Sequence, residues 1–153
     1  MNIRPEPLSA EHLAALRGAL PSAPATMPDL RAAIILRLML FEGMRQGAIS
    51  RLTMGAYQPR TAEGPARLEF PGKFGLETVI LSDETADLMD EYLGRSHRKE
   101  GELLHSAGSN VMTRTLDEHA EKAGVPCPSP HAVRNAVFAE KLKGVGRERG
   151  EAR

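Results

Sequence analysis

The stretch SPHAVRNAVFAEKL, residues 129–142, places a histidine and an arginine where the pattern predicts the first turn of an amphipathic helix. His131 follows a proline, and Arg134 comes three residues later. A helix N-terminus favours anions, because its unpaired backbone N–H groups carry a partial positive charge. Two donor side chains at that place point to a phosphate ligand. The alternative is that His131 only begins the helix and binds nothing.

Length and composition indicate one soluble globular domain. The chain has 153 residues, of which 41% are apolar and 26% charged, a composition typical of folded rather than disordered proteins. No apolar run approaches the roughly 20 residues of a membrane span, and the first residues lack a signal-peptide core. Cys127 is the single cysteine, so we interpret it as a spectator thiol and expect a cytoplasmic protein with no membrane partner.

The net charge is zero, which by itself counts against a dedicated nucleic-acid binder. The charges are unevenly distributed, however. Residues 31–80 hold seven basic and four acidic residues, residues 81–104 hold three basic and seven acidic, and residues 105–153 hold eight basic and six acidic. The segments on either side of the acidic one therefore lean basic. The acidic segment itself is interpreted as a solvated helix face, the alternative being a surface for a basic partner.

Periodicity, capping residues and breakers predict a mostly α (α+β) fold. The predicted helices span residues 7–22, 28–43, 46–52, 82–93, 109–124 and 131–144. The second of these is apolar on nearly all sides, so we expect it to be central and buried. Ser9 and Ser82 or Asp83 are the expected N-caps, and Gly43, Gly124 and Gly144 the expected stops.

One small antiparallel β-hairpin is expected between the third and fourth helices. Residues 66–70 and 77–81 alternate apolar and polar side chains, and PGKFG at 71–75 supplies turn residues. This places Lys73 at or near the hairpin tip. A short extended piece is expected at residues 102–109, and residues 145–153 are expected to form a frayed tail.

Four side chains from three stretches form a set that suits one phosphodiester: Arg45, Lys73, His131 and Arg134. Arginines make forked, charge-assisted bonds to phosphate oxygens. A lysine can protonate a departing oxygen, and a histidine can donate or shuttle a proton. The simpler alternatives are that Arg45 caps the preceding helix and that Lys73 is an ordinary surface lysine.

The sequence resembles the catalytic domain of the tyrosine recombinase (phage integrase) family. GMRQGAISRL is similar to that family's first-arginine box, GKFGLETVILSDE to its lysine hairpin, and SPHAVRNAVFAEKL to its histidine–arginine box. LSAEHLAAL looks like the usual start of the domain. The boxes follow the family's order, with 28 residues from Arg45 to Lys73 and 58 from Lys73 to His131. The resemblance covers residues 7–144.

The resemblance implies double-stranded DNA as the partner, and roles for the four side chains in DNA recombination and integration by a mobile element. Arg45 and Arg134 would clamp the scissile phosphate. Lys73 would act as general acid toward the leaving 5′ oxygen, and His131 would assist proton transfer. No metal or other cofactor is implied, because the arginines and the lysine stabilise the phosphate charge in this chemistry.

The sequence also departs from the family pattern. The family's nucleophilic tyrosine lies downstream of the histidine–arginine box, whereas residues 135–153 contain no His, Trp or Tyr. Tyr92, a predicted packing residue, and Tyr57, a predicted strand or turn residue, do not match that place. Ala48 stands where an acidic brace is common, and Asn135 where histidine is common. We therefore expect a domain that is inactive alone in strand transfer.

The expected organisation is a single domain over residues 1–153 with a core at 7–144, without the family's N-terminal DNA-clamp domain. Three explanations stay open for the missing nucleophile: a truncated fragment, a pseudo-recombinase that binds DNA, or a tyrosine supplied by another subunit. Self-association, or association with a full-length recombinase, is a further expected partnership.

Two other classes of function stay open at this stage. RQGAISRLTMGAYQPR, residues 45–60, has some likeness to the recognition half of a helix-turn-helix, which would make the protein a small transcription regulator. The zero net charge favours a protein-interaction module without DNA contact. Salt-dependent DNA binding separates this last class from the others. His97, His105 and His119 have no metal-type spacing and are interpreted as structural or surface residues.

Overall fold

The fold is mostly helical with one small antiparallel sheet, as predicted. The computed structural model describes residues 8–21, 24–96 and 109–151. The helices are α1 (Ala10–Gly18), α2 (Met27–Leu40), α3 (Gln46–Ser50), α4 (Asp83–Arg95), α5 (Ser109–Ala123) and α6 (Pro130–Glu151), with a 3-10 helix, η1 (Met54–Ala56). The strands are β1 (Tyr57–Gln58), β2 (Arg67–Gly72) and β3 (Gly75–Ile80). The extended piece predicted at residues 102–109 falls almost wholly outside the described residues.

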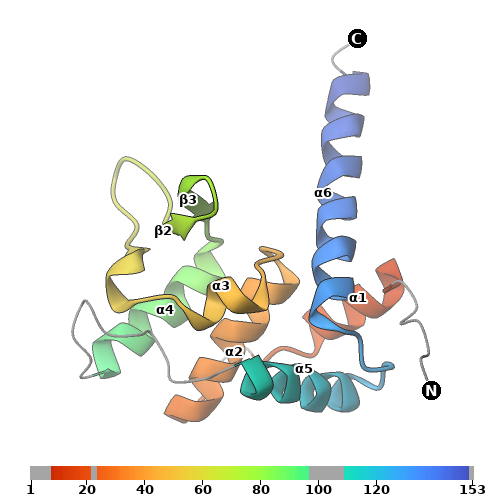
Figure 1. Ribbon diagram of the computed structural model, residues 1–153, viewed down its shortest axis with the longest axis horizontal. Coiled ribbons are helices and arrows are strands. Elements are labelled where there is room, and N and C mark those ends of the chain that lie inside the picture. Colours follow the sequence, from red (N-terminus) through yellow and green to blue (C-terminus); the bar gives the residue numbers. More distant parts are fainter. Residues whose placement is uncertain (1–7, 22–23, 97–108, 152–153) are drawn as a thin grey trace.

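Helix α2 is the centre of the fold, which confirms the prediction of a buried helix. It packs against α1, α3, α4, α5 and α6 (Figure 1). Eight of its fourteen residues are buried, among them Leu30, Ile35 and Leu38, so the helix is apolar on nearly every side. Its start is fixed by Thr26, whose side-chain oxygen accepts a hydrogen bond from the Asp29 backbone N–H at 3.2 Å.

Serine side chains cap three further helices. Ser9 accepts from the His12 N–H at 3.1 Å at the start of α1, and Ser82 accepts from the Thr85 N–H at 3.3 Å at the start of α4. Both caps were predicted. Ser129 accepts from the Ala132 N–H at 3.0 Å, and α6 begins at Pro130, one residue earlier than expected. Each cap satisfies an otherwise unpaired backbone donor.

The predicted hairpin is formed by β2 and β3. Their register runs from Arg67 opposite Ile80 to Gly72 opposite Gly75, which leaves Lys73 and Phe74 as the two turn residues. β2 buries alternate side chains, whereas most of β3 is exposed. The third strand, β1, pairs with β2. Its two residues are too short a run for sequence periodicity to reveal.

A turn that requires glycine at residue 43 connects α2 to α3. α2 ends at Leu40, and Gly43 adopts a φ of 67°, which side chains on L-residues disfavour. A Cβ at this position would lie 3.0 Å from the Phe138 ring and 3.1 Å from a Val137 methyl group. α6 therefore packs directly on the backbone of this turn.

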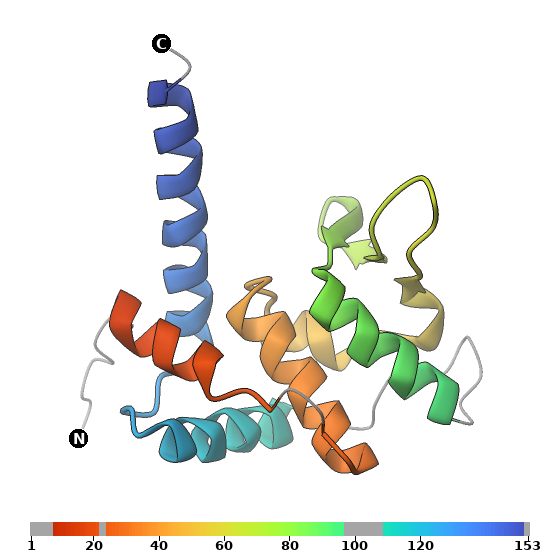
Figure 2. The ribbon, with the colours of Figure 1, turned by 180° about the vertical axis from the view of Figure 1, so that it is seen from behind.

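The prediction that the last helix ends at Gly144 was wrong. α6 continues through Gly144 to Glu151, so the segment expected as a frayed tail is helical. A glycine lowers helix propensity by only about 1 kcal/mol, and the residues that follow contain no proline and several good helix formers. Figures 1 and 2 both show this part of α6 extending away from the other helices.

The acidic helix α4 has a cationic partner within the chain. The guanidinium of Arg60 lies 2.6 Å from an Asp87 oxygen, 2.9 Å from an Asp90 oxygen and 3.5 Å from an Asp83 oxygen. The Tyr57 hydroxyl donates to Asp90 at 2.7 Å. These contacts neutralise part of the acidic face, so less of it is left for an external basic partner.

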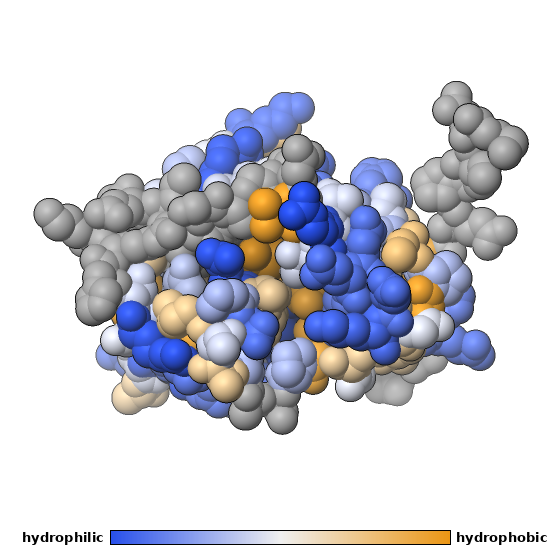
Figure 3. All heavy atoms as spheres, turned by 90° about the horizontal axis from the view of Figure 1, so that it is seen from below, coloured by the Kyte–Doolittle hydropathy of each residue, from blue (hydrophilic) through white to orange (hydrophobic). Residues whose placement is uncertain are grey.

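Over the described residues no helix is both long and apolar enough to cross a membrane. The view from below shows mainly hydrophilic and weakly polar residues, with a narrow group of hydrophobic ones near its centre (Figure 3). The large exposed apolar side chains lie on the hairpin and on α5 and α6: Phe74, Leu76, Ile80, Val111, Phe138 and Leu142.

Replacing Gly43 by alanine should destabilise the fold by at least about 1–2 kcal/mol, because the left-handed conformation becomes strained and the new methyl group meets α6. Gly18→Ala is the matched control, since nothing lies within 4 Å of a Cβ there. It should leave stability unchanged or raise it. Urea unfolding of both variants measures the difference, and equal stability of Gly43→Ala and the parent chain would contradict the strained-turn explanation.

Candidate phosphate-binding site

Two adjoining pockets bring the four predicted site residues together. The smaller, about 410 Å³, is lined by Arg45, Gln46, Pro130, His131 and Arg134. The larger, about 500 Å³, lies among the α2–α3 turn, the hairpin and α6, and its lining includes Lys73. Arg45 and Arg134 line both pockets, whereas Lys73 and His131 each line one. The arginine pair is thus the common element of the site.

Arg134 is held in place by the Gly43 turn. Its Nη1 donates a hydrogen bond of 2.7 Å to the Gly43 carbonyl oxygen, and its Cζ lies 4.2 Å from the centre of the Phe138 ring. Burial lowers the pKa of Arg134, and so does the nearby charge of Arg45, while Glu77 acts in the opposite direction. Two guanidinium groups that repel one another favour an anion between them.

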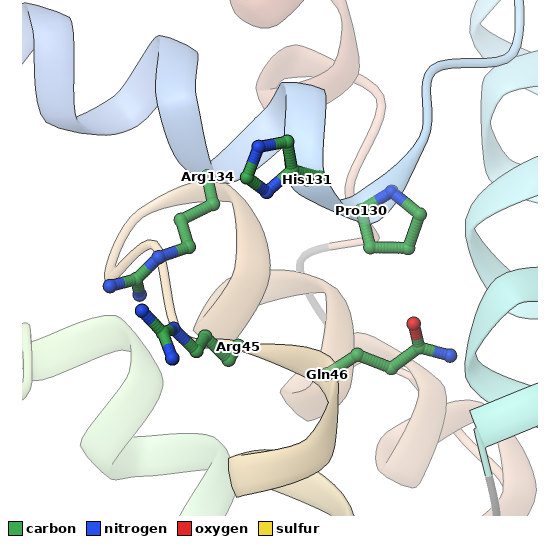
Figure 4. A pocket seen from close by; sticks show the side chains of 5 residues that line it. All are labelled: Arg45, Gln46, Pro130, His131 and Arg134. Carbon is green, nitrogen blue, oxygen red and sulfur yellow. The ribbon is translucent and has the colours of Figure 1, made fainter. Parts of the chain in front are cut away.

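Arg45 lies at the N-cap of the short helix α3 with an extended backbone. Its side chain is exposed and, within the described parts of the chain, makes no hydrogen bond or ion pair. Figure 4 shows its guanidinium beside that of Arg134. The alternative that Arg45 caps α2 finds no support, because the Leu40 carbonyl at the end of α2 accepts from Arg17 Nε at 3.0 Å.

Lys73 and His131 approach the arginine pair from different elements. Lys73 is exposed in the β2–β3 turn, with its Nζ 5.6 Å from the centre of the Phe74 ring. His131 is exposed in the first turn of α6, and Figure 4 shows its ring at the same helix start as Pro130. Both side chains are therefore accessible to a ligand.

The site also contains residues that the sequence analysis missed. Gln46 lines the smaller pocket, and its side-chain nitrogen donates to Thr113 Oγ1 at 2.9 Å, which ties α3 to α5. Glu42 and Glu77 add two carboxylates to the larger pocket. Gln46 was detectable as the neighbour of Arg45. Glu77 was not, because its place depends on how the hairpin sits against α6.

Four residues mark the departures from the family pattern: Ala48, Asn135, Tyr57 and Tyr92. Ala48 lines the larger pocket, where its methyl group offers no acidic brace, and Asn135 lines neither pocket. Tyr57 and Tyr92 are buried and line neither pocket. Burial raises the pKa of Tyr57, and the hydrogen bond to Asp90 raises it further, which makes its hydroxyl a poorer nucleophile.

His119 and Cys127 line neither pocket. His119 is buried, with Nε2 2.7 Å from the Leu16 carbonyl oxygen, which confirms a structural role. Cys127 is exposed. His97 and His105 lie outside the described residues. In the described ranges no group of three His, Cys, Asp or Glu side chains is arranged to hold a metal ion.

The helix-turn-helix alternative is wrong. α3 has five residues and is followed by η1 and then β1, so the segment after Arg45 contains no helix long enough to enter a major groove. The short helix predicted at residues 46–52 is confirmed, with its end two residues earlier.

No family model matches the chain. A curated relative, tyrosine recombinase slr0733 of Synechocystis sp., is 26% identical over an alignment of 132 residues that covers 78% of this chain and 42% of the relative. The solved structure of XerA recombinase aligns with a TM-score of 0.70 over 94% of this chain and 51% of XerA, at 18% identity. XerH site-specific recombinase, solved in a pre-cleavage complex with its difH substrate, aligns with a TM-score of 0.70 over 94% of this chain and 46% of XerH, at 16% identity.

The domain has a tyrosine-recombinase-like fold. The fold likeness confirms the mostly α fold with a small antiparallel sheet, and the curated relative confirms the resemblance stated from the sequence motifs. The domain spans about half the length of these proteins or less.

The carboxylate of Glu42 should make the stability of the domain depend on pH. Burial raises the pKa of Glu42 above its ordinary value of 4.5, against the smaller opposing effects of Lys141 and Arg37. A raised folded-state pKa means that the contribution of Glu42 to stability is fully present below pH 4.5 and is lost as pH rises through the folded pKa. Glu42→Gln should therefore raise Tm at pH 7, and this gain should shrink near pH 4.

Thermal unfolding at both pH values measures this effect, with Glu63→Gln as the control at an exposed loop carboxylate. A Glu42→Gln variant that is less stable than the parent at pH 7 would show that the attraction to Lys141 and Arg37 outweighs burial.

Proposed function

We propose that this domain binds duplex DNA by holding a backbone phosphate between Arg45 and Arg134, in a role related to site-specific DNA recombination. The observation that supports this best is the pairing of the two guanidinium groups in a shared pocket, where the charge of Arg45 lowers the pKa of Arg134. Repulsion between them is relieved when a phosphate binds, and each can form charge-assisted hydrogen bonds to its oxygens.

The start of α6 adds to the attraction for a phosphate. The helix has 22 residues and begins at the smaller pocket, so its dipole favours negative charge there. His131 in this first turn can donate a hydrogen bond to a phosphate oxygen. The same anion would thus be bound by side chains and by the helix end.

Lys73 is proposed as the proton donor toward a leaving 5′ oxygen, with His131 assisting proton transfer. Its place in the hairpin turn supports this, because an exposed lysine at a pocket rim can reach a bound backbone. A general acid must come within hydrogen-bond reach of the oxygen it protonates. Lys73 in the hairpin turn and the arginine pair would then contact the same DNA strand.

Within these 153 residues, neither tyrosine is proposed as a nucleophile. Tyr57 donates its hydroxyl hydrogen bond to Asp90, both tyrosines are buried, and both lie outside the two pockets. We therefore infer that the chain, acting alone, binds DNA without forming a covalent link to it. A tyrosine from outside these 153 residues would be needed for strand transfer in this site.

The DNA-binding proposal is tested by fluorescence anisotropy with a short duplex at low and moderate salt. Arg45→Ala/Arg134→Ala should weaken binding by at least about tenfold at low salt and reduce the slope of log K against log salt by about 0.9, the contribution of the one phosphate contact that the pair makes together. Arg31→Ala/Arg95→Ala is the matched control, because it removes two arginines that line neither pocket.

Absence of binding by the parent chain even near 50 mM salt would overturn the proposal and favour a protein-interaction module. Equal losses in the two double variants would show that the overall charge, and not the arginine pair, attracts the DNA.

The absence of a nucleophile is tested by incubating the chain with nicked duplex DNA and separating the mixture on a denaturing gel. No covalent protein–DNA adduct is expected. An adduct that disappears in Tyr57→Phe or Tyr92→Phe would contradict the inference and identify the attacking residue.

A further inference from the structure

Arg51 is a third arginine at the larger pocket, and the family resemblance gives it no role. It follows directly after α3 and lines the pocket together with Arg45, Lys73 and Arg134. Its side chain is exposed to solvent. The pocket therefore holds more positive charge than a single phosphate requires.

The side chain of Arg51 turns back along α3. A Cβ built on Gly47 would lie 3.7 Å from Arg51 Nη1, so the guanidinium lies over this glycine, one helical turn earlier in the chain. Gly47 itself lines the larger pocket. The backbone at residue 47 is thus covered by the Arg51 guanidinium, which forms part of the pocket wall.

The Arg51 guanidinium is uncommitted among the described residues. Other arginines of the fold donate hydrogen bonds to oxygen atoms of the chain: Arg17, Arg37, Arg60, Arg67, Arg95 and Arg134. The described residues offer no such bond and no ion pair to Arg51, although Glu42 and Glu77 line the same pocket. Its donors are available to a ligand.

Arg45 and Arg51 flank the two ends of α3, so their backbones lie roughly 9 Å apart along the helix axis at 1.5 Å per residue, with the Arg51 guanidinium folded back over Gly47 between these two positions. Each strand of duplex DNA carries one phosphate per about 3.4 Å of its axis. A strand that follows α3 therefore presents more than one phosphate over this length. A single phosphate held by Arg45 and Arg134 leaves the donors of Arg51 for another.

We infer that Arg51 binds a second backbone phosphate, next to the one held by Arg45 and Arg134, and so fixes the direction in which the DNA strand crosses the site. This inference rests on the proposed function. The contact carries no base information, because phosphates are the same in every sequence. Its contribution is to affinity and to orientation of the strand.

The test is the salt dependence of duplex binding by the single variants Arg51→Ala, Arg51→Lys and Arg31→Ala, measured by anisotropy. Arg51→Ala should reduce the slope of log K against log salt by about 0.9, the value for one lost phosphate contact. Arg51→Lys should restore the slope, because lysine keeps the charge. Arg31→Ala, at a residue outside both pockets, should leave the slope unchanged.

A parent-like slope for Arg51→Ala, while Arg45→Ala/Arg134→Ala is impaired, would overturn the second phosphate contact and leave the proposed function standing. Equal slope changes in Arg51→Ala and Arg31→Ala would also overturn it, because long-range charge would then explain both. A parent chain that does not bind DNA would instead contradict the proposed function itself. Thermal unfolding of each variant is the control that tests whether the fold is retained.

Discussion

The tight turn at Gly43 is the constraint on which the site depends. Its positive φ ends the central helix, and the missing side chain lets α6 pack on the backbone. That contact places the Gly43 carbonyl where Arg134 donates to it, two residues before Arg45. A larger residue at this turn would push α6 away and separate the two arginines. One glycine thus couples the packing of the core to the geometry of a phosphate pocket.

Much of the fold was predictable because it follows from local rules. The apolar sequence of α2 requires burial on all sides, serine caps define the starts of α1 and α4, and alternation with a glycine-rich turn defines the hairpin. The three motif stretches were also found in sequence, and the structure brings their four predicted side chains to two adjoining pockets. Their chemical roles stay predictions.

The remaining features depend on tertiary contacts that local patterns do not encode. Gly144 resembles a stop signal, yet the following residues keep α6 helical to Glu151. The two residues of β1 form a strand only because β2 lies beside them. Glu77 reaches the larger pocket because of the hairpin register, and Arg51 lines it with a side chain that folds back over Gly47. Hydrophobic periodicity predicts neither placement.

The central claim is that Arg45 and Arg134 together hold a DNA phosphate. The most direct measurement is an NMR titration of the arginine side-chain Nε–Hε signals with short duplex DNA. Large shifts of the Arg45 and Arg134 signals are predicted, with little change for Arg60, whose guanidinium is paired with the aspartates of α4. Unchanged Arg45 and Arg134 signals under conditions where the DNA binds would contradict the claim.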